Sequence, residues 1–254
     1  MSWSRVQDHR ILGVLLGSLA VLAWGALWLG ERGPLSHSLL HSGHAAHMGM
    51  SQWTMSAIFV AGWILMTIAM MLPTSSPLIL LFHRMVGERP YAGWLIGLLV
   101  AGYLAVWTVF GLLVHLLNLA LQAVAAGIPW LAGNAWLGSA AILLGAGVYQ
   151  FSSLKYACLD KCRAPMSFLI ARWRGAHPAG EAFRLGADHG IYCVGCCWSL
   201  MLVMFAVGTG SVAWMLALAA VMALEKNVPW GRRLAAPVGV VLIGGAAAVL
   251  IRQI

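Results

Sequence analysis

Charged side chains are scarce in this sequence. Asp and Glu number 7 and Lys and Arg number 15 among 254 residues, so that 9% of the chain is charged and 61% is apolar. A mean hydropathy of +0.87 excludes a water-soluble domain of this length and indicates a polytopic membrane protein. The net charge of +8 does not indicate nucleic-acid binding, because the basic residues occupy short gaps between apolar runs.

The sequence also lacks an internal repeat, a low-complexity linker and a soluble domain, so we expect a single integral membrane domain over residues 1–254. The predicted fold class is all-α, a polytopic transmembrane helix bundle of about seven spans. Each apolar run is near the roughly 20 residues that cross a hydrocarbon core. The first is interpreted as a retained helix, because it lacks a persuasive signal-peptide cleavage site. The runs cover residues 11–30, 53–82, 92–117, 134–151, 191–208, 211–226 and 234–251.

Two prolines, Pro73 and Pro77, interrupt the long second run. Proline removes a backbone donor and clashes with the preceding helical turn, so a kink or break is predicted around Pro73. Ser75 and Ser76 are expected to help satisfy the freed carbonyls.

Basic residues are nearly absent from one of the two sides that seven spans would define. All of the 15 Lys and Arg except Arg32 and Arg252 fall in the N-terminal tail or in the gaps 83–91, 152–190 and 226–233. This asymmetry predicts a cytoplasmic N-terminus and an external C-terminus. We therefore expect a multi-pass protein of the bacterial inner (cytoplasmic) membrane, with the lipid bilayer as its surroundings.

Cysteine is rare, and the five that occur form two groups. Cys193, Cys196 and Cys197 follow His189 at steps of three and four residues, which places all four on about one third of a helix circumference. An earlier pair, Cys158 and Cys162, is spaced by four and can also share a helix face.

Both groups lie near the predicted cytoplasmic boundary, where thiols stay reduced, so disulfides are disfavoured. Imidazole and thiol ligands suit Cu(I) and Zn(II). The core ligands are expected to be Cys158, Cys162, Cys193 and Cys196, with His189 and Cys197 as alternates or as a second position. Near the first pair, Lys155, Lys161 and Arg163 are expected to favour the thiolate form.

A second candidate metal site lies on the predicted external side, where imidazole and thioether groups occur together without carboxylates. This composition suits copper better than calcium or magnesium. A weak, nonspecific metal sponge or a solvated linker remains an alternative interpretation. The residues are His37, His41, His44, His47, Met48 and Met50.

Ionisable residues inside the predicted spans are few. They are His115 in the third span and Glu225 with Lys226 at the end of the sixth. Because such residues are costly in a bilayer, a functional role is the default interpretation. Alternatively, Lys226 reaches the cytoplasm and Glu225 pairs with it.

Several segments together resemble a bacterial family of predicted metal-binding integral membrane proteins. The resemblance runs from about residue 55 to 228, and its cysteine motifs are the most specific part. It implies a polytopic inner-membrane protein with metal-binding cysteines, and no particular activity. The segments are Ala69–Pro77, Tyr149–Gln150, Leu154–Pro165, His189–Trp198 and the pair Glu225-Lys226.

The sequence lacks a carboxylate–histidine set for acid–base catalysis, a cofactor fingerprint and a phosphate loop, which disfavours an enzyme. We expect a protein that binds copper, or else zinc, and acts in its transport, delivery or sensing, with partner membrane proteins or a metallochaperone. Three alternatives remain open: a structural zinc that joins helices four and five, a membrane oxidoreductase, and an accessory subunit of a membrane complex. The oxidoreductase would be metal-dependent or would use Cys193-Val-Gly-Cys196 as a redox pair.

Overall fold

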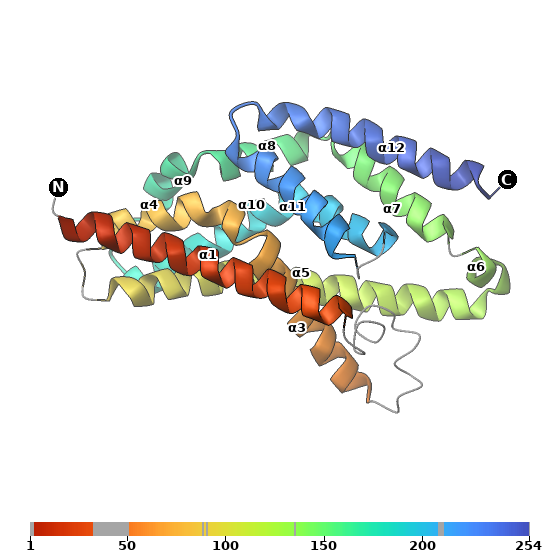
Figure 1. Ribbon diagram of the computed structural model, residues 1–254, viewed down its shortest axis with the longest axis horizontal. Coiled ribbons are helices and arrows are strands. Elements are labelled where there is room, and N and C mark those ends of the chain that lie inside the picture. The colour runs from red at the N-terminus through yellow and green to blue at the C-terminus, as the bar shows by residue number, and fades with distance from the viewer. Residues whose placement is uncertain are drawn as a thin grey trace.

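The computed structural model describes residues 3–32, 51–87, 89, 91–134, 136–207 and 211–253. Most of these residues are helical and none forms a strand, which confirms the all-α class. Figure 1 shows long helices packed side by side, with α1 along the front and α7 beside α12 near the C-terminus.

Every apolar run predicted from the sequence coincides with a helix. The second run is divided between α3 and α4, and three further helices, α6, α8 and α9, lie between runs. The elements are α1 (Trp3–Arg32), α3 (Gln52–Met70), η2 (Pro73–Ser75), α4 (Ser76–Val86), α5 (Ala92–Gly127), α6 (Pro129–Gly133), α7 (Trp136–Tyr149), α8 (Ser153–Arg163), α9 (Pro165–Arg172), α10 (Pro178–Val207), α11 (Val212–Asn227), η3 (Gly231–Leu234) and α12 (Ala235–Ile251).

Several helices are long and apolar enough to cross a membrane. By length and composition, five qualify among the described residues, and the pair α7 and α8, bent by 66°, could form a sixth, broken span. Helix α11 is shorter, at 16 residues. Apolar side chains also cover the outside, such as Val241, which is 72% exposed. The number of seven spans and their orientation stay predictions. The five are Ile11–Arg32, Trp53–Met70, Ala92–Gly127, Pro178–Val207 and Gly231–Ile251.

The break predicted in the second run is confirmed. Helix α3 ends at Met70, and the chain passes through η2, which begins at Pro73, before α4 starts. The side chain that satisfies a freed carbonyl is Thr74, whose Oγ1 donates to the Met71 carbonyl oxygen at 2.8 Å. The expectation for Ser75 was wrong, because its hydroxyl faces His189 across the core instead.

The segment 152–190, which was expected to be a loop, is largely helical. It contains α8, α9 and the first turns of α10. These helices carry many polar residues, so a pattern of apolar runs does not detect them. Local signals were nevertheless present: the Ser152 hydroxyl accepts from the Lys155 backbone N–H at 3.1 Å, and Pro165 and Pro178 open α9 and α10.

Helices α5 and α10 cross closely at the centre of the molecule. A Cβ added to Gly186 would lie 1.9 Å from the Leu99 carbonyl oxygen, and one added to Gly102 would lie 2.1 Å from the Phe183 carbonyl oxygen. Only glycine allows this approach, and with Gly190 the α10 side has the Gly-xxx-Gly spacing of close helix pairs.

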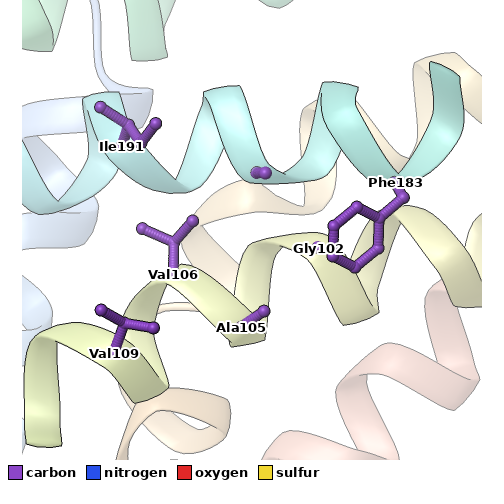
Figure 2. A pocket seen from close by; sticks show the side chains of 7 residues that line it. Gly102, Ala105, Val106, Val109, Phe183 and Ile191 are labelled. Carbon is purple, nitrogen blue, oxygen red and sulfur yellow. The ribbon is translucent and has the colours of Figure 1, made fainter. Parts of the chain in front are cut away.

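One side of this crossing is an apolar groove of about 330 Å³, shown in Figure 2. Its lining contains no polar side chain. The histidine and the cysteines of α10 are buried on the opposite, inner side of the crossing. The groove is lined by Gly102, Ala105, Val106, Val109, Phe183, Ala187 and Ile191.

Candidate metal centre

The cysteines of α10 lie on one buried face of the helix, as their spacing predicted. Cys193, Cys196 and Cys197 are each at most 1% exposed. The Cys196 and Cys197 thiols point back along the helix and donate to the Cys193 carbonyl oxygen at 3.1 and 2.9 Å. The helical repeat therefore gathers three sulfurs at one level of the core.

Helix α8 brings the other two cysteines against this face. The sulfur atoms of Cys162 and Cys196 are 3.9 Å apart. Cys158 packs on Gly195, where an added Cβ would lie 2.5 Å from the Cys158 sulfur. All five cysteines are free thiols. The glycine in Cys193-Val-Gly-Cys196 thus lets α8 approach closely enough for thiols of both helices to meet.

The pair Cys162–Cys196 has a spacing suited to one soft ion. Two thiolates bound to a single tetrahedral zinc, at about 2.3 Å each, lie roughly 3.8 Å apart. Cys196 is buried and Cys162 is half-buried, so this pair lies at the rim of the cluster. No group of three or more His, Cys, Asp and Glu side chains is arranged to hold an ion within the described ranges. The donor set itself, thiols without carboxylates, fits Cu(I) or Zn(II).

His189 is buried one turn before the thiols, and it faces a hydroxyl. Its Nε2 lies 3.3 Å from Ser75 Oγ, and its ring packs near the rings of Tyr103 and Phe168. Its Nδ1 has no hydrogen-bond partner among the described residues. The structure therefore places His189 beside the cluster, in contact with Ser75.

Lys226 points into the core, with its ammonium surrounded by sulfur. Its Nζ lies 3.0 Å from Cys193 Sγ, 3.9 Å from Cys197 Sγ, 3.7 Å from Met71 Sδ and 3.3 Å from Thr74 Oγ1. The residue is 6% exposed, so the alternative that it reaches the cytoplasm is wrong in this structure. The reason is tertiary: the end of α11 packs against η2, which turns the lysine inward.

Glu225 pairs with Lys155 and not with its neighbour Lys226. The Lys155 ammonium donates to Glu225 Oε2 at 2.8 Å, and both side chains are almost fully buried. The alternative pairing failed because consecutive residues on a helix point in directions about 100° apart. Lys155 is thus engaged by a carboxylate, and the lysine in contact with thiols is Lys226. Arg163 also binds the Glu225 and Pro229 carbonyl oxygens, which joins α8 to the end of α11.

His115 lies apart from the thiols. It is on α5, twelve residues after Tyr103, which corresponds to about 18 Å along the helix axis. Its Nε2 is 3.0 Å from Ser56 Oγ, and its ring stacks on Phe59. His115 therefore belongs to a separate contact between α3 and α5.

The predicted external site falls on residues outside those that the structure describes. This applies to His37, His41, His44, His47, Met48 and Met50.

Sequence reasoning missed two residues that touch the cluster from distant helices. The Tyr103 hydroxyl is 3.0 Å from Cys193 Sγ, and the Met71 Sδ atom lies 3.7 Å from Cys197 Sγ. Met71 belongs to the Ala69–Pro77 segment of the family resemblance described above, so the sequence did contain a signal for this residue. Nothing in the local sequence distinguishes Tyr103 from the other aromatic residues of its apolar run.

Comparison with curated proteins and with solved structures gives no match. A family model does match: PpoB2, described as "Copper chaperone", covers residues 60–249. That range includes the cysteines of α8 and α10 together with Met71, Tyr103 and Lys226. The match is consistent with the metal-related resemblance seen in the sequence. Because it extends over most of the chain, the protein belongs to the PpoB2 family, described as copper chaperone, which suggests a copper-related function.

Proposed function

We propose that this protein is a membrane-embedded copper carrier, which takes up Cu(I) on the thiols shared by α8 and α10 and delivers it to a partner protein. The observation that carries the proposal is the pair Cys162–Cys196, whose sulfurs lie 3.9 Å apart across two helices. We call Cys162 and Cys196 the outer pair. Cys158 and Cys193 lie one turn away from it on the same two helices.

Copper is preferred over zinc because of the atoms around the thiols. The cluster contains a thioether, Met71, and the nearby carboxylate of Glu225 is bound to Lys155. Thiolate and thioether ligands together select Cu(I), whereas zinc sites usually combine thiolates with imidazole or further thiolates. Membership of the copper chaperone family supports the same choice.

Delivery is favoured over permanent storage because the outer pair lies at a rim. A closed four-thiolate site retains its ion, whereas a half-buried ligand such as Cys162 leaves a side open to an incoming ligand. We infer that a metallochaperone or partner membrane protein exchanges copper there, on the cytoplasmic side of a bacterial inner membrane. His37, His41, His44, His47, Met48 and Met50 would collect or release copper on the other side.

The test is anaerobic Cu(I) titration of the detergent-purified protein against a competing chelator, with elemental analysis. We expect about one tightly bound copper per chain for the outer pair, and binding at least about tenfold weaker, or about 1.4 kcal/mol, in the variant Cys162→Ser/Cys196→Ser. The exposed His177 provides a control, since His177→Gln should bind copper as the unmodified protein does.

Each contrary result points elsewhere. Stoichiometric zinc that resists chelators would support a structural zinc between α8 and α10. Absence of metal together with a Cys162–Cys196 or Cys193–Cys196 disulfide that forms and is reduced in cells would support a thiol oxidoreductase. Absence of both would contradict the carrier and favour an accessory subunit.

A further inference from the structure

The environment of Lys226 is unusual for a buried ammonium. Four groups surround its Nζ within 3.9 Å: the sulfurs of Cys193, Cys197 and Met71 and the hydroxyl of Thr74. Thiols and thioethers are weak hydrogen-bond acceptors. Three sulfur atoms and one hydroxyl therefore give the buried ammonium only weak hydrogen bonds.

No carboxylate forms an ion pair with Lys226 within the part of the chain that the structure describes. The described ion pairs use the carboxylates of Asp160, Asp188 and Glu225, and their partners are two arginines and Lys155. A buried charge normally persists only with a paired and hydrogen-bonded counter-charge. The groups that face Lys226 are instead the ligands that a soft metal ion prefers.

We propose that Met71, Cys193 and Cys197 form an inner Cu(I) subsite in which the Lys226 ammonium takes the place of the copper ion until copper displaces it. This inference rests on the proposed copper-carrier function and extends it. Copper would pass inward from the outer pair, because Cys193 lies one turn from Cys196 on the same helix. The sulfurs of Cys197 and Met71 are already 3.7 Å apart, so both can reach one ion.

Charge balance favours a monovalent ion at this subsite. Cu(I) and an ammonium each carry a single positive charge, so copper replaces the buried cation by another of the same charge. The transfer is a ligand substitution in which copper remains Cu(I). Copper–sulfur bonds to the two outer thiolates break as those to the inner sulfurs form, and the protons of the Cys193 and Cys197 thiols pass to the two outer thiolates that copper leaves. Zn(II) would bring one extra positive charge to a position where the described residues place no carboxylate in an ion pair with the resident ammonium.

The displaced ammonium has a path to the surface. Lys226 is the penultimate residue of α11, and Asn227, which ends the helix, is exposed. A lysine side chain can extend its methylene groups along the helix end and place its charge in water. Displacement therefore requires rotation of one side chain and no rearrangement of the bundle.

The three lysines of the chain provide an internal experiment. Lys161 is exposed, Lys155 is buried against Glu225, and Lys226 is buried among the sulfurs. Reductive methylation followed by peptide mass spectrometry reports the accessibility of each amine. Without copper, Lys161 should react and the other two should be protected.

Addition of two equivalents of Cu(I) should raise the methylation of Lys226 at least about tenfold while Lys155 stays protected, because a protected site becomes reactive only when it opens locally. Two equivalents of Zn(II) should leave Lys226 protected. In Met71→Leu, copper should still bind to the outer pair, but the increase at Lys226 should be lost.

Failure of this inference can be distinguished from failure of the carrier proposal. If copper binds through Cys162 and Cys196 but Lys226 stays protected, or if Met71→Leu exposes Lys226 as fully as the unmodified protein does, the inner subsite is refuted and the outer pair stands. Exposure of Lys155 together with Lys226 would also contradict a local displacement. If no copper binds at all, both proposals are refuted.

Discussion

Substitution of Gly195 tests the proposed copper site at Cys162 and Cys196 without removing any sulfur. A Cβ at this position would lie 2.5 Å from the Cys158 sulfur and 3.3 Å from its Cβ. Rotation of the Cys158 thiol relieves only the first contact. Since carbon contacts are favourable at roughly 3.5–4.0 Å, the remaining contact at 3.3 Å should push α8 away from α10 by about 0.2–0.7 Å in Gly195→Ala. The Cys162–Cys196 distance, now 3.9 Å, should increase accordingly.

The expected magnitude follows from the cost of overpacking, which is about 1–3 kcal/mol for an extra methyl group in a tight contact. If this cost falls on the copper-bound form, where two thiols must share one ion, affinity for Cu(I) decreases by about 5- to 150-fold. Chelator competition on the anaerobic protein measures this change. Gly180→Ala is the matched control, because it is on the same helix and has no atom within 4 Å of the added Cβ.

A second substitution distinguishes a change in the distance between α8 and α10 from the loss of Cys158 as a ligand. In Gly195→Ala/Cys158→Ala the sulfur that meets the new methyl group is gone, so α8 can return and most of the affinity of the outer pair should be recovered. Unchanged copper affinity in Gly195→Ala, measured on a protein with an unaltered melting temperature, would refute the spacing argument. Failure of the double variant to recover would show that Cys158 is itself a required ligand.

Three further outcomes follow from the same contacts. Glu225→Gln leaves the Lys155 ammonium buried without its carboxylate and should destabilise the protein by about 3–5 kcal/mol in thermal melts, whereas Glu225→Gln/Lys155→Met should recover part of that loss. Lys226→Met removes the cation that copper must displace, so Cu(I) affinity should rise about tenfold; an unchanged affinity would contradict displacement. Mild oxidation should link Cys162 to Cys196 before any other pair, as peptide mapping would reveal, because these two thiols lie 3.9 Å apart on facing helices.

The helical fold and the grouping of the thiols were predictable from local pattern. Apolar runs mark helices because a backbone in lipid must satisfy its own hydrogen bonds, and each predicted run did coincide with a helix. Steps of three and four residues placed Cys193, Cys196 and Cys197 on one face for the same helical reason. Pro73 marked the break between α3 and α4, because proline acts on its own turn of chain.

The polar helices and the pairing of charges were less predictable. Helices α8, α9 and the start of α10 lack a continuous apolar run, so the segment 152–190 was expected to be a loop. Glu225 and Lys226 are adjacent in the sequence and were paired for that reason, yet their side chains diverge. The partner of Glu225 is Lys155, which lies seventy residues earlier in the sequence. No local sequence feature of either residue predicts that the two side chains meet.

The sequence by itself determined the element types, the apolar character of the helices and the soft-ligand chemistry of the site, because these depend on residue type and short-range periodicity. Only the tertiary structure decided which groups meet. The close approach of α5 and α10 at glycines brings Tyr103 to Cys193, and the packing of α11 on η2 directs Lys226 toward Met71 and the thiols. Such contacts join residues 90 to 155 positions apart, so they are set by how whole helices pack and not by the residues beside them in the chain.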